Sequence, residues 1–250
     1  MARGWKDWCE SRRCGILAPV SPPLDPLPIL FALGWVVRVR GISREEGHEA
    51  ITRAAWDGLD LTAEQQRALI RGVRAPDVSL AGLVTSVLPF AQRRHALRAW
   101  SGTPSATAVR DVRAFLASTH LRAFATPEGP RRWATIGGLL HCLQDSYSLA
   151  HADRDGGVIL RMKHWGPFDG GRRPRSGDEH GFPSDRRDRP WRDGSLTMEA
   201  RAAVEASRRY LEIAVAGSAS RDEFAAFLDR YVQEVVPLVD ARFGSPVGFP

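Results

Sequence analysis

Apolar residues recur at helical spacing along most of the chain from about residue 43 onward. Two capping boxes mark helix starts, Ser43-Arg44-Glu45-Glu46 and Thr62-Ala63-Glu64-Gln65. The first opens a predicted helix that ends at Gly58, and the second a helix to about Val73 that Pro76 breaks. Further helices are predicted over residues 80–100, 105–119, 130–150, 196–216 and 220–242. No stretch alternates as a strand would, so the pattern predicts an all-α, multi-helix single domain.

Two segments lack this periodicity. Residues 153–194 are rich in Gly, Pro, Arg and Asp, which predicts a long irregular loop inserted into the helical domain. Residues 1–40 are rich in Pro and Arg and are predicted to form a leader or a poorly ordered extension. The helical domain is therefore expected to occupy residues 41–250.

The N-terminal segment leaves the compartment open. A short apolar run at residues 27–34 ends in Ala32 and Gly34, which are small residues of the kind that signal peptidase cuts after. Asp25 and several prolines interrupt that run, so export to the periplasm or medium and a cytoplasmic location both stay open. No apolar run approaches the roughly 18 residues of a transmembrane helix.

The basic charge favours an anionic partner. The formal net charge is +6, and all but two of the 35 basic residues are arginines, the exceptions being Lys6 and Lys163. Phosphates, nucleic acid and lipid headgroups suit such a surface, although arginines on a solvated surface would give the same balance. The sequence gives no sign of an obligate protein partner.

The most informative stretch reads His141-Cys-Leu-Gln-Asp145-x5-His151. Residues four apart lie on one face of a helix, so His141 and Asp145 can bind one ion together. Imidazole and carboxylate are suitable zinc ligands. Taken alone, the pair is equally typical of a buried histidine that is hydrogen-bonded to an aspartate.

The wider set of residues resembles the zinc-dependent phospholipase C and S1/P1 nuclease family. This element is preceded by His48, Asp77 and His95, and the resemblance covers about residues 42–185. It implies a helical fold that holds up to three zinc ions with His and Asp ligands in this chain order. It further implies that His141, Asp145, His95 and Asp77 hold one ion of a pair, that Asp77 also serves as base, and that Asp145 bridges to a second ion held by His48.

The remaining implied ligands depart from the family pattern. His151 would hold a third ion with a later histidine and carboxylate, and His180 with Asp185 is preferred because Ser184 and Asp185 resemble a helix start. The alternative is His164 with Asp169, and both pairs are one residue longer than the family spacing. In the family an N-terminal Trp binds the ion that His48 would hold, so Trp35 is expected to be a ligand if cleavage after Gly34 makes it the N-terminus.

The resemblance implies phosphoester hydrolysis by a metal-activated water. A phospholipase C-like activity on phospholipid is placed ahead of an S1/P1-type nuclease activity on nucleic acid, and a non-catalytic helical metal-binding protein is a further alternative. An HD-type phosphohydrolase is disfavoured because none of the seven histidines is followed by Asp. His120, near the end of a predicted helix, matches no position of the motif and is expected at a cap or on the surface.

Overall fold

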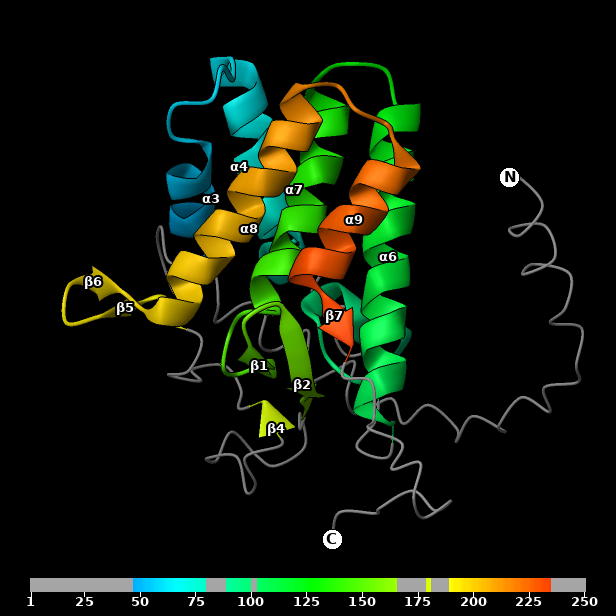
Figure 1. Ribbon diagram of the computed structural model, residues 1–250. Coiled ribbons are helices and arrows are strands. Elements are labelled where there is room, and N and C mark those ends of the chain that lie inside the picture. Colours follow the sequence, from blue (N-terminus) through cyan, green and yellow to red (C-terminus); the bar gives the residue numbers. More distant parts are fainter. Residues whose placement is uncertain (1–46, 80–88, 100–102, 166–178, 181–188, 235–250) are drawn as a thin grey trace, which may run out of the picture.

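The computed structural model describes residues 47–79, 89–99, 103–165, 179–180 and 189–234, and this part of the chain is mostly helical (Figure 1). Its α helices and one 3-10 helix are α3 (His48–Trp56), α4 (Ala63–Val78), η1 (Pro89–His95), α6 (Ser105–Ala125), α7 (Pro130–Asp145), α8 (Met198–Val215) and α9 (Arg221–Tyr231). The predicted extension at residues 1–40 lies outside the described residues.

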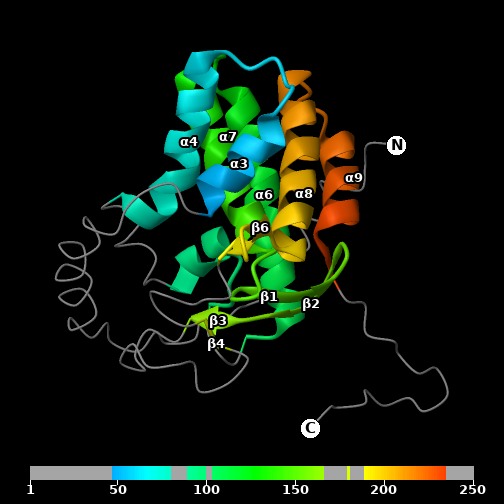
Figure 2. The ribbon, with the colours of Figure 1, turned by 90° about the vertical axis from the view of Figure 1, so that its left-hand side faces the viewer.

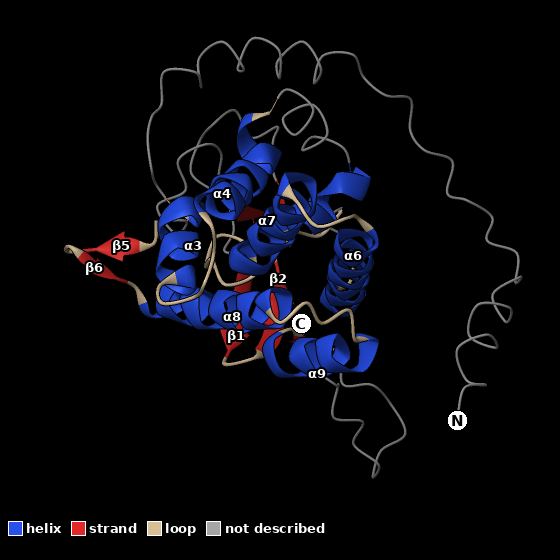
Figure 3. Ribbon diagram, turned by 90° about the horizontal axis from the view of Figure 1, so that it is seen from above, coloured by secondary structure: helices blue, strands red, loops and turns tan. Residues whose placement is uncertain are grey.

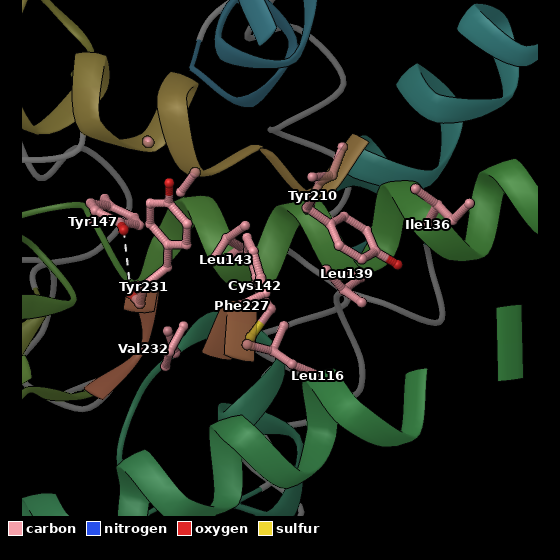
Figure 4. Packing of buried hydrophobic residues seen from close by; sticks show 14 of the residues in the cluster. Leu116, Ile136, Leu139, Cys142, Leu143, Tyr147, Tyr210, Phe227, Tyr231 and Val232 are labelled. Atoms are coloured by element: carbon pink, nitrogen blue, oxygen red, sulfur yellow. Dashed lines mark hydrogen bonds between the residues drawn. The ribbon is translucent and has the colours of Figure 1, made fainter. Parts of the chain in front are cut away.

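The central element of the bundle is α7. Seen from the end of the bundle, α7 is surrounded by α4, α3, α8 and α6 (Figure 3), and the side view in Figure 2 shows α3 crossing between α4 and α8. Ile136, Leu139, Leu140 and Leu143 on α7 are fully buried. Figure 4 shows α7 side chains packed among residues of α6, α8 and α9. Burial on several sides gives the last turn of α7, which ends at Asp145, a rigid support.

Two glycines allow α4 and α7 to approach closely. A Cβ at Gly72 would lie 2.1 Å from the Ala134 carbonyl oxygen, and one at Gly137 would lie 2.4 Å from the Leu69 carbonyl oxygen. Both contacts are with backbone, which cannot turn aside as a flexible side chain would. The glycines therefore set the distance between the helices that carry Asp77 and Asp145.

Gly137→Ala is expected to lower the free energy of unfolding by about 2 kcal/mol, because the new methyl group must push α4 and α7 apart. The matched control is Gly138→Ala, where a Cβ would meet nothing within 4 Å. That variant should be stabilised by up to about 1 kcal/mol, since Ala replaces Gly within a helix. Urea denaturation of both variants measures the difference, and equal shifts would contradict the packing described.

Several predicted helix boundaries can be compared with the structure. The Thr62 capping box is confirmed, because Thr62 Oγ1 accepts from Gln65 N at 3.2 Å and Gln65 Oε1 accepts from Thr62 N at 2.7 Å. The predicted break at Pro76 is wrong, since α4 continues through it to Val78. Pro76 lies in the last turn, where its fixed φ is helical and its missing N–H removes one bond only. The Ser43 capping box lies outside the described residues.

The irregular loop predicted over residues 153–194 is wrong in part, because that region contains short strands. β1 (Ala152–Asp155) and β2 (Val158–Met162) form an antiparallel hairpin, and β7 (Gln233–Glu234) pairs parallel with β2. β3 (His164–Trp165) pairs parallel with β4 (Glu179–His180), and β5 (Trp191–Arg192) pairs antiparallel with β6 (Ser195–Leu196). β7 also occupies part of the helix predicted to reach residue 242, since α9 ends at Tyr231.

Glycines in the turns explain the β1–β2 and β5–β6 hairpins. Gly156 and Gly194 have φ of 55° and 78°, and Asp193 before Gly194 has φ of 52°. Positive φ at such positions is what two-residue hairpin turns require. The Gly-rich composition is therefore in part a turn signal. Within the described ranges, no helix combines the length and the apolar character that crossing a bilayer requires.

Candidate metal centre

Residues from four helical elements and one turn converge at the C-terminal end of α7. They are His48 at the start of α3, Asp77 in the last turn of α4, His95 at the end of η1, His141 and Asp145 on α7, and His151 in the turn after α7. The preferred set of expected metal ligands contains these six residues together with His180 and Asp185. The structure brings all six together.

Asp145 is the centre of this cluster, and four imidazoles surround its buried carboxylate. His48 Nε2 lies 3.0 Å and His151 Nε2 lies 3.7 Å from Asp145 Oδ1. His141 Nε2 lies 3.1 Å and His95 Nδ1 lies 3.4 Å from Asp145 Oδ2. Asp145 is 4% exposed. One carboxylate thus faces ring nitrogens through both of its oxygens, as a ligand that bridges two ions would.

The opposite ring nitrogen of three histidines is anchored to an oxygen. His48 Nδ1 donates to Gln144 Oε1 at 3.0 Å, and His141 Nδ1 donates to the Val73 carbonyl oxygen at 2.9 Å. His151 Nδ1 donates to the His95 carbonyl oxygen. Such a bond fixes the ring orientation and leaves Nε2 as the nitrogen that can bind a metal. All three Nε2 atoms face Asp145, so these histidines could bind a metal ion together with it.

His95, His141 and Asp145 have the mutual spacing of ligands to one metal ion, and Asp77 faces two of them. His141 Nε2 lies 3.0 Å from His95 Nδ1, and both nitrogens contact Asp145 Oδ2 at the distances given above. Asp77 Oδ1 lies 3.8 Å from His95 Nδ1 and 3.7 Å from His141 Nε2. Donor atoms bound at about 2.0–2.1 Å to a tetrahedral zinc ion lie about 3.3–3.4 Å apart. The separations among His95, His141 and Asp145 lie near that value, so these three could hold one such ion, with Asp77 slightly farther away.

A second set of donors lies on the other side of Asp145. His48 Nε2 contacts Asp145 Oδ1 at 3.0 Å and lies 3.8 Å from Asp77 Oδ2. Asp77 therefore offers one oxygen to each set, as Asp145 does. The first set includes His95 and His141. On the second side His48 is the imidazole nearest to Asp145 Oδ1, and His151 Nε2 lies 3.7 Å from the same oxygen.

The charges at the cluster favour a cation. Burial alone would lower the pKa of His48, but the carboxylates of Asp145 and Asp77 outweigh it and raise that pKa to about 10. Burial would likewise raise the pKa of Asp145, but His151, His141 and His48 hold it well below its usual range. Asp145 Oδ2 is buried and makes no well-formed hydrogen bond, although His141 Nε2 lies 3.1 Å away. A buried carboxylate oxygen in that state suits a positive ion, and the residues present fit one.

Asp77 lies on the side of the cluster that is exposed to solvent. Its side chain is 48% exposed, whereas those of His141 and Asp145 are 0% and 5% exposed. Among the described ligand side chains, Asp77 is thus the most exposed, followed by His48 at 23%, and solvent reaches the cluster on this side. This position suits a carboxylate that exchanges protons with water.

Only some of the ligands expected for a third ion lie among the described residues. His151 lies in the cluster, as described above. His164 lies among the described residues, and its Nδ1 is 3.4 Å from a guanidinium nitrogen of Arg98. The backbone of His180 pairs with that of Trp165, while Asp169, Asp185 and Trp35 lie outside the described residues.

The sequence pattern did not identify the groups that anchor the histidines. Gln144 adjoins Asp145, but nothing in the local sequence indicates that its side chain faces His48 on α3. The Val73 carbonyl is a backbone group, so the type of residue at position 73 gives no indication of its role. Such groups become recognisable only when the helix packing is known. His120, expected at a cap or on the surface, is instead buried within α6, which extends beyond the predicted end to Ala125.

Comparisons of this chain with protein-family models, with curated proteins and with solved structures each give no match.

Proposed function

We propose that the protein is a zinc-dependent phosphoester hydrolase with a phospholipase C/P1 nuclease-like fold, and that its activity is phospholipase C-like. The observation that carries this proposal is the single buried carboxylate of Asp145 surrounded by four imidazoles, three of which are anchored through Nδ1. A His–Asp pair that is merely hydrogen-bonded would not require three further imidazoles around the same carboxylate. The chain order of these residues supports the same family, as the sequence motif does.

His95, His141, Asp145 and Asp77 would hold one ion, and His48 would hold a second through the shared carboxylates. Bound zinc supplies an acidified water near neutral pH and positive charge for phosphoryl oxygens. Asp77 is the carboxylate with access to solvent, so it orients the attacking water and accepts its proton. Buried Asp145 holds its charge between the two donor sets and keeps the histidines facing inward. The helices around α7 bury His141 and Asp145, while Asp77 and part of His48 stay open to solvent.

A nuclease activity is the alternative within the same chemistry. The net charge of +6 favours it, because a nucleic acid substrate carries many phosphates. Assays on phosphatidylcholine vesicles and on single-stranded DNA, run side by side with zinc-loaded protein, separate the two. A non-catalytic metal-binding protein would bind zinc and cleave neither.

Asp77→Asn is expected to lower kcat for hydrolysis of bis(p-nitrophenyl) phosphate about a hundredfold, because the amide cannot accept the proton of the water. The exposed Asp60 offers a matched control, and Asp60→Asn should leave kcat unchanged. Zinc content is measured on the same samples, so that loss of metal and loss of a base are told apart. A zinc-loaded wild type that cleaves no phosphodiester would refute the hydrolase proposal and leave the metal-binding one.

A further inference from the structure

Gln144 lies between the candidate metal centre and α8. Its side chain is 2% exposed. Gln144 Oε1 accepts from His48 Nδ1 at 3.0 Å, while its Nε2 donates to Thr52 Oγ1 at 2.9 Å and to Ser207 Oγ at 3.3 Å. Thr52 and Ser207 are both fully buried. The amide thus uses its oxygen toward His48 and both amide hydrogens toward hydroxyl groups of α3 and α8.

Three contacts on one amide fix its rotation. In the orientation that the structure shows, both hydrogens of Nε2 are directed to the hydroxyl oxygens of Thr52 and Ser207, and Oε1 is directed to His48. An oxygen can accept from an imidazole N–H but can donate nothing. His48 is therefore held with its proton on Nδ1, and its Nε2 faces Asp145 Oδ1 at 3.0 Å.

We infer that Gln144 is a positioning residue that selects the metal-binding tautomer of His48 and fixes the direction of its Nε2, an inference that rests on the proposed metal centre. His48 depends on this support more than the other histidines do. His141 and His151 are anchored by backbone carbonyls, which no side-chain substitution removes. Among the described residues, His48 Nε2 is the ring nitrogen closest to Asp145 Oδ1, at 3.0 Å against 3.7 Å for His151 Nε2. Loss of the Gln144 oxygen should therefore weaken one ion and leave the other in place.

The test compares Gln144→Leu with Gln144→Glu in the full chain. Leu removes the acceptor and should weaken binding of the second zinc ion about 10- to 100-fold, as loss of such an outer contact generally does. Glu keeps an oxygen on His48 Nδ1 and should bind zinc at least as tightly as wild type, because a carboxylate raises the basicity of the ring. Gln66→Leu is the matched control, since Gln66 on α4 donates to the Leu61 carbonyl away from the cluster. Zinc affinity is measured by competition with a chromophoric chelator.

A second readout detects the tautomer itself. Long-range ¹H–¹⁵N correlation spectra at one fixed, limiting zinc concentration should show His48 protonated on Nδ1 and metal-bound through Nε2 in wild type and in Gln144→Glu, and the Nε2-bound signal should be lost in Gln144→Leu. A merely structural glutamine would lower the melting temperature of the Leu variant without changing this spectrum. Wild-type zinc affinity and an unchanged His48 spectrum in folded Gln144→Leu would overturn the inference while leaving the metal centre intact.

Two further outcomes are decisive. If Gln144→Leu does not fold, Thr52→Val removes one of the hydroxyl contacts with little change of shape. It should weaken the second ion by about threefold or more, since the amide is then free to turn. An unchanged affinity would overturn the inference. Failure of wild type to bind any zinc would overturn both the proposed metal centre and the role of Gln144.

Discussion

Asp145→Asn should abolish binding of at least one zinc ion and lower phosphodiester hydrolysis by about a thousandfold. Both donor sets share this carboxylate, so its loss removes a ligand from each. Metal ions contribute several kcal/mol to stabilising phosphoryl charge, and each 1.4 kcal/mol is about tenfold in rate. Asn keeps the volume of the side chain, which separates the loss of charge from a change in packing.

Asp111→Asn is the control for this variant, because Asp111 is exposed on α6. It should retain wild-type metal content and activity. The far-ultraviolet circular dichroism of both variants establishes that they are folded. Full activity in a folded Asp145→Asn protein would show that the cluster is not where catalysis takes place.

The metal-free protein should lose about 3 kcal/mol of stability through His120 as the pH falls from 6.5 to about 4. His120 is 1% exposed, and its ring stacks on Phe224 at a centroid distance of 4.2 Å. Its Nε2 is buried without a hydrogen bond. Burial lowers the pKa of His120 from 6.5 to about 4, and the charge of Glu223 opposes this only in part.

The sign follows from which state binds the proton. Above pH 6.5 the imidazole is neutral in both states, and its contribution is constant. Below pH 6.5 the unfolded chain takes up a proton that the folded protein does not, so stability decreases until the folded ring is also protonated near pH 4. Over that window the slope is about 1.4 kcal/mol per pH unit.

His120→Phe isolates this contribution, because it keeps an aromatic ring and removes the titrating group. The free energy of unfolding is measured in urea at several pH values between 4 and 7 for both proteins in the presence of a chelator. The difference between wild type and variant should change by about 3 kcal/mol across the window. A constant difference would show that His120 does not titrate in this way.

The sequence predicted the helical architecture and the core of the site because both are recorded in local spacing. His141 and Asp145 lie one helical turn apart and share a face, and the Thr62 box starts α4 where expected. The errors arise where a local signal has two meanings. The Gly-rich composition of residues 153–194 predicts a loop, although Gly156 and Gly194 form hairpin turns there. Pro76 predicts a helix end, although the last turn of α4 tolerates it.

Long-range contacts account for what no pattern could supply. β7 exists because residues 233–234 pair with residues 158–159, and neither segment shows this pairing alone. The anchoring of His48 by Gln144 joins residues 96 positions apart. His120 was expected near a helix end, but packing of α6 against Tyr210 and Phe224 encloses it.

The most direct test of the metal centre is the metal content of protein purified without a histidine tag, measured by inductively coupled plasma mass spectrometry. We expect about two to three zinc ions per chain, as paired or trinuclear sites require, and their loss in a His141→Ala/Asp145→Ala double variant. Correctly folded wild-type protein without stoichiometric metal would contradict the account and leave the cluster as a structural network of histidines around Asp145.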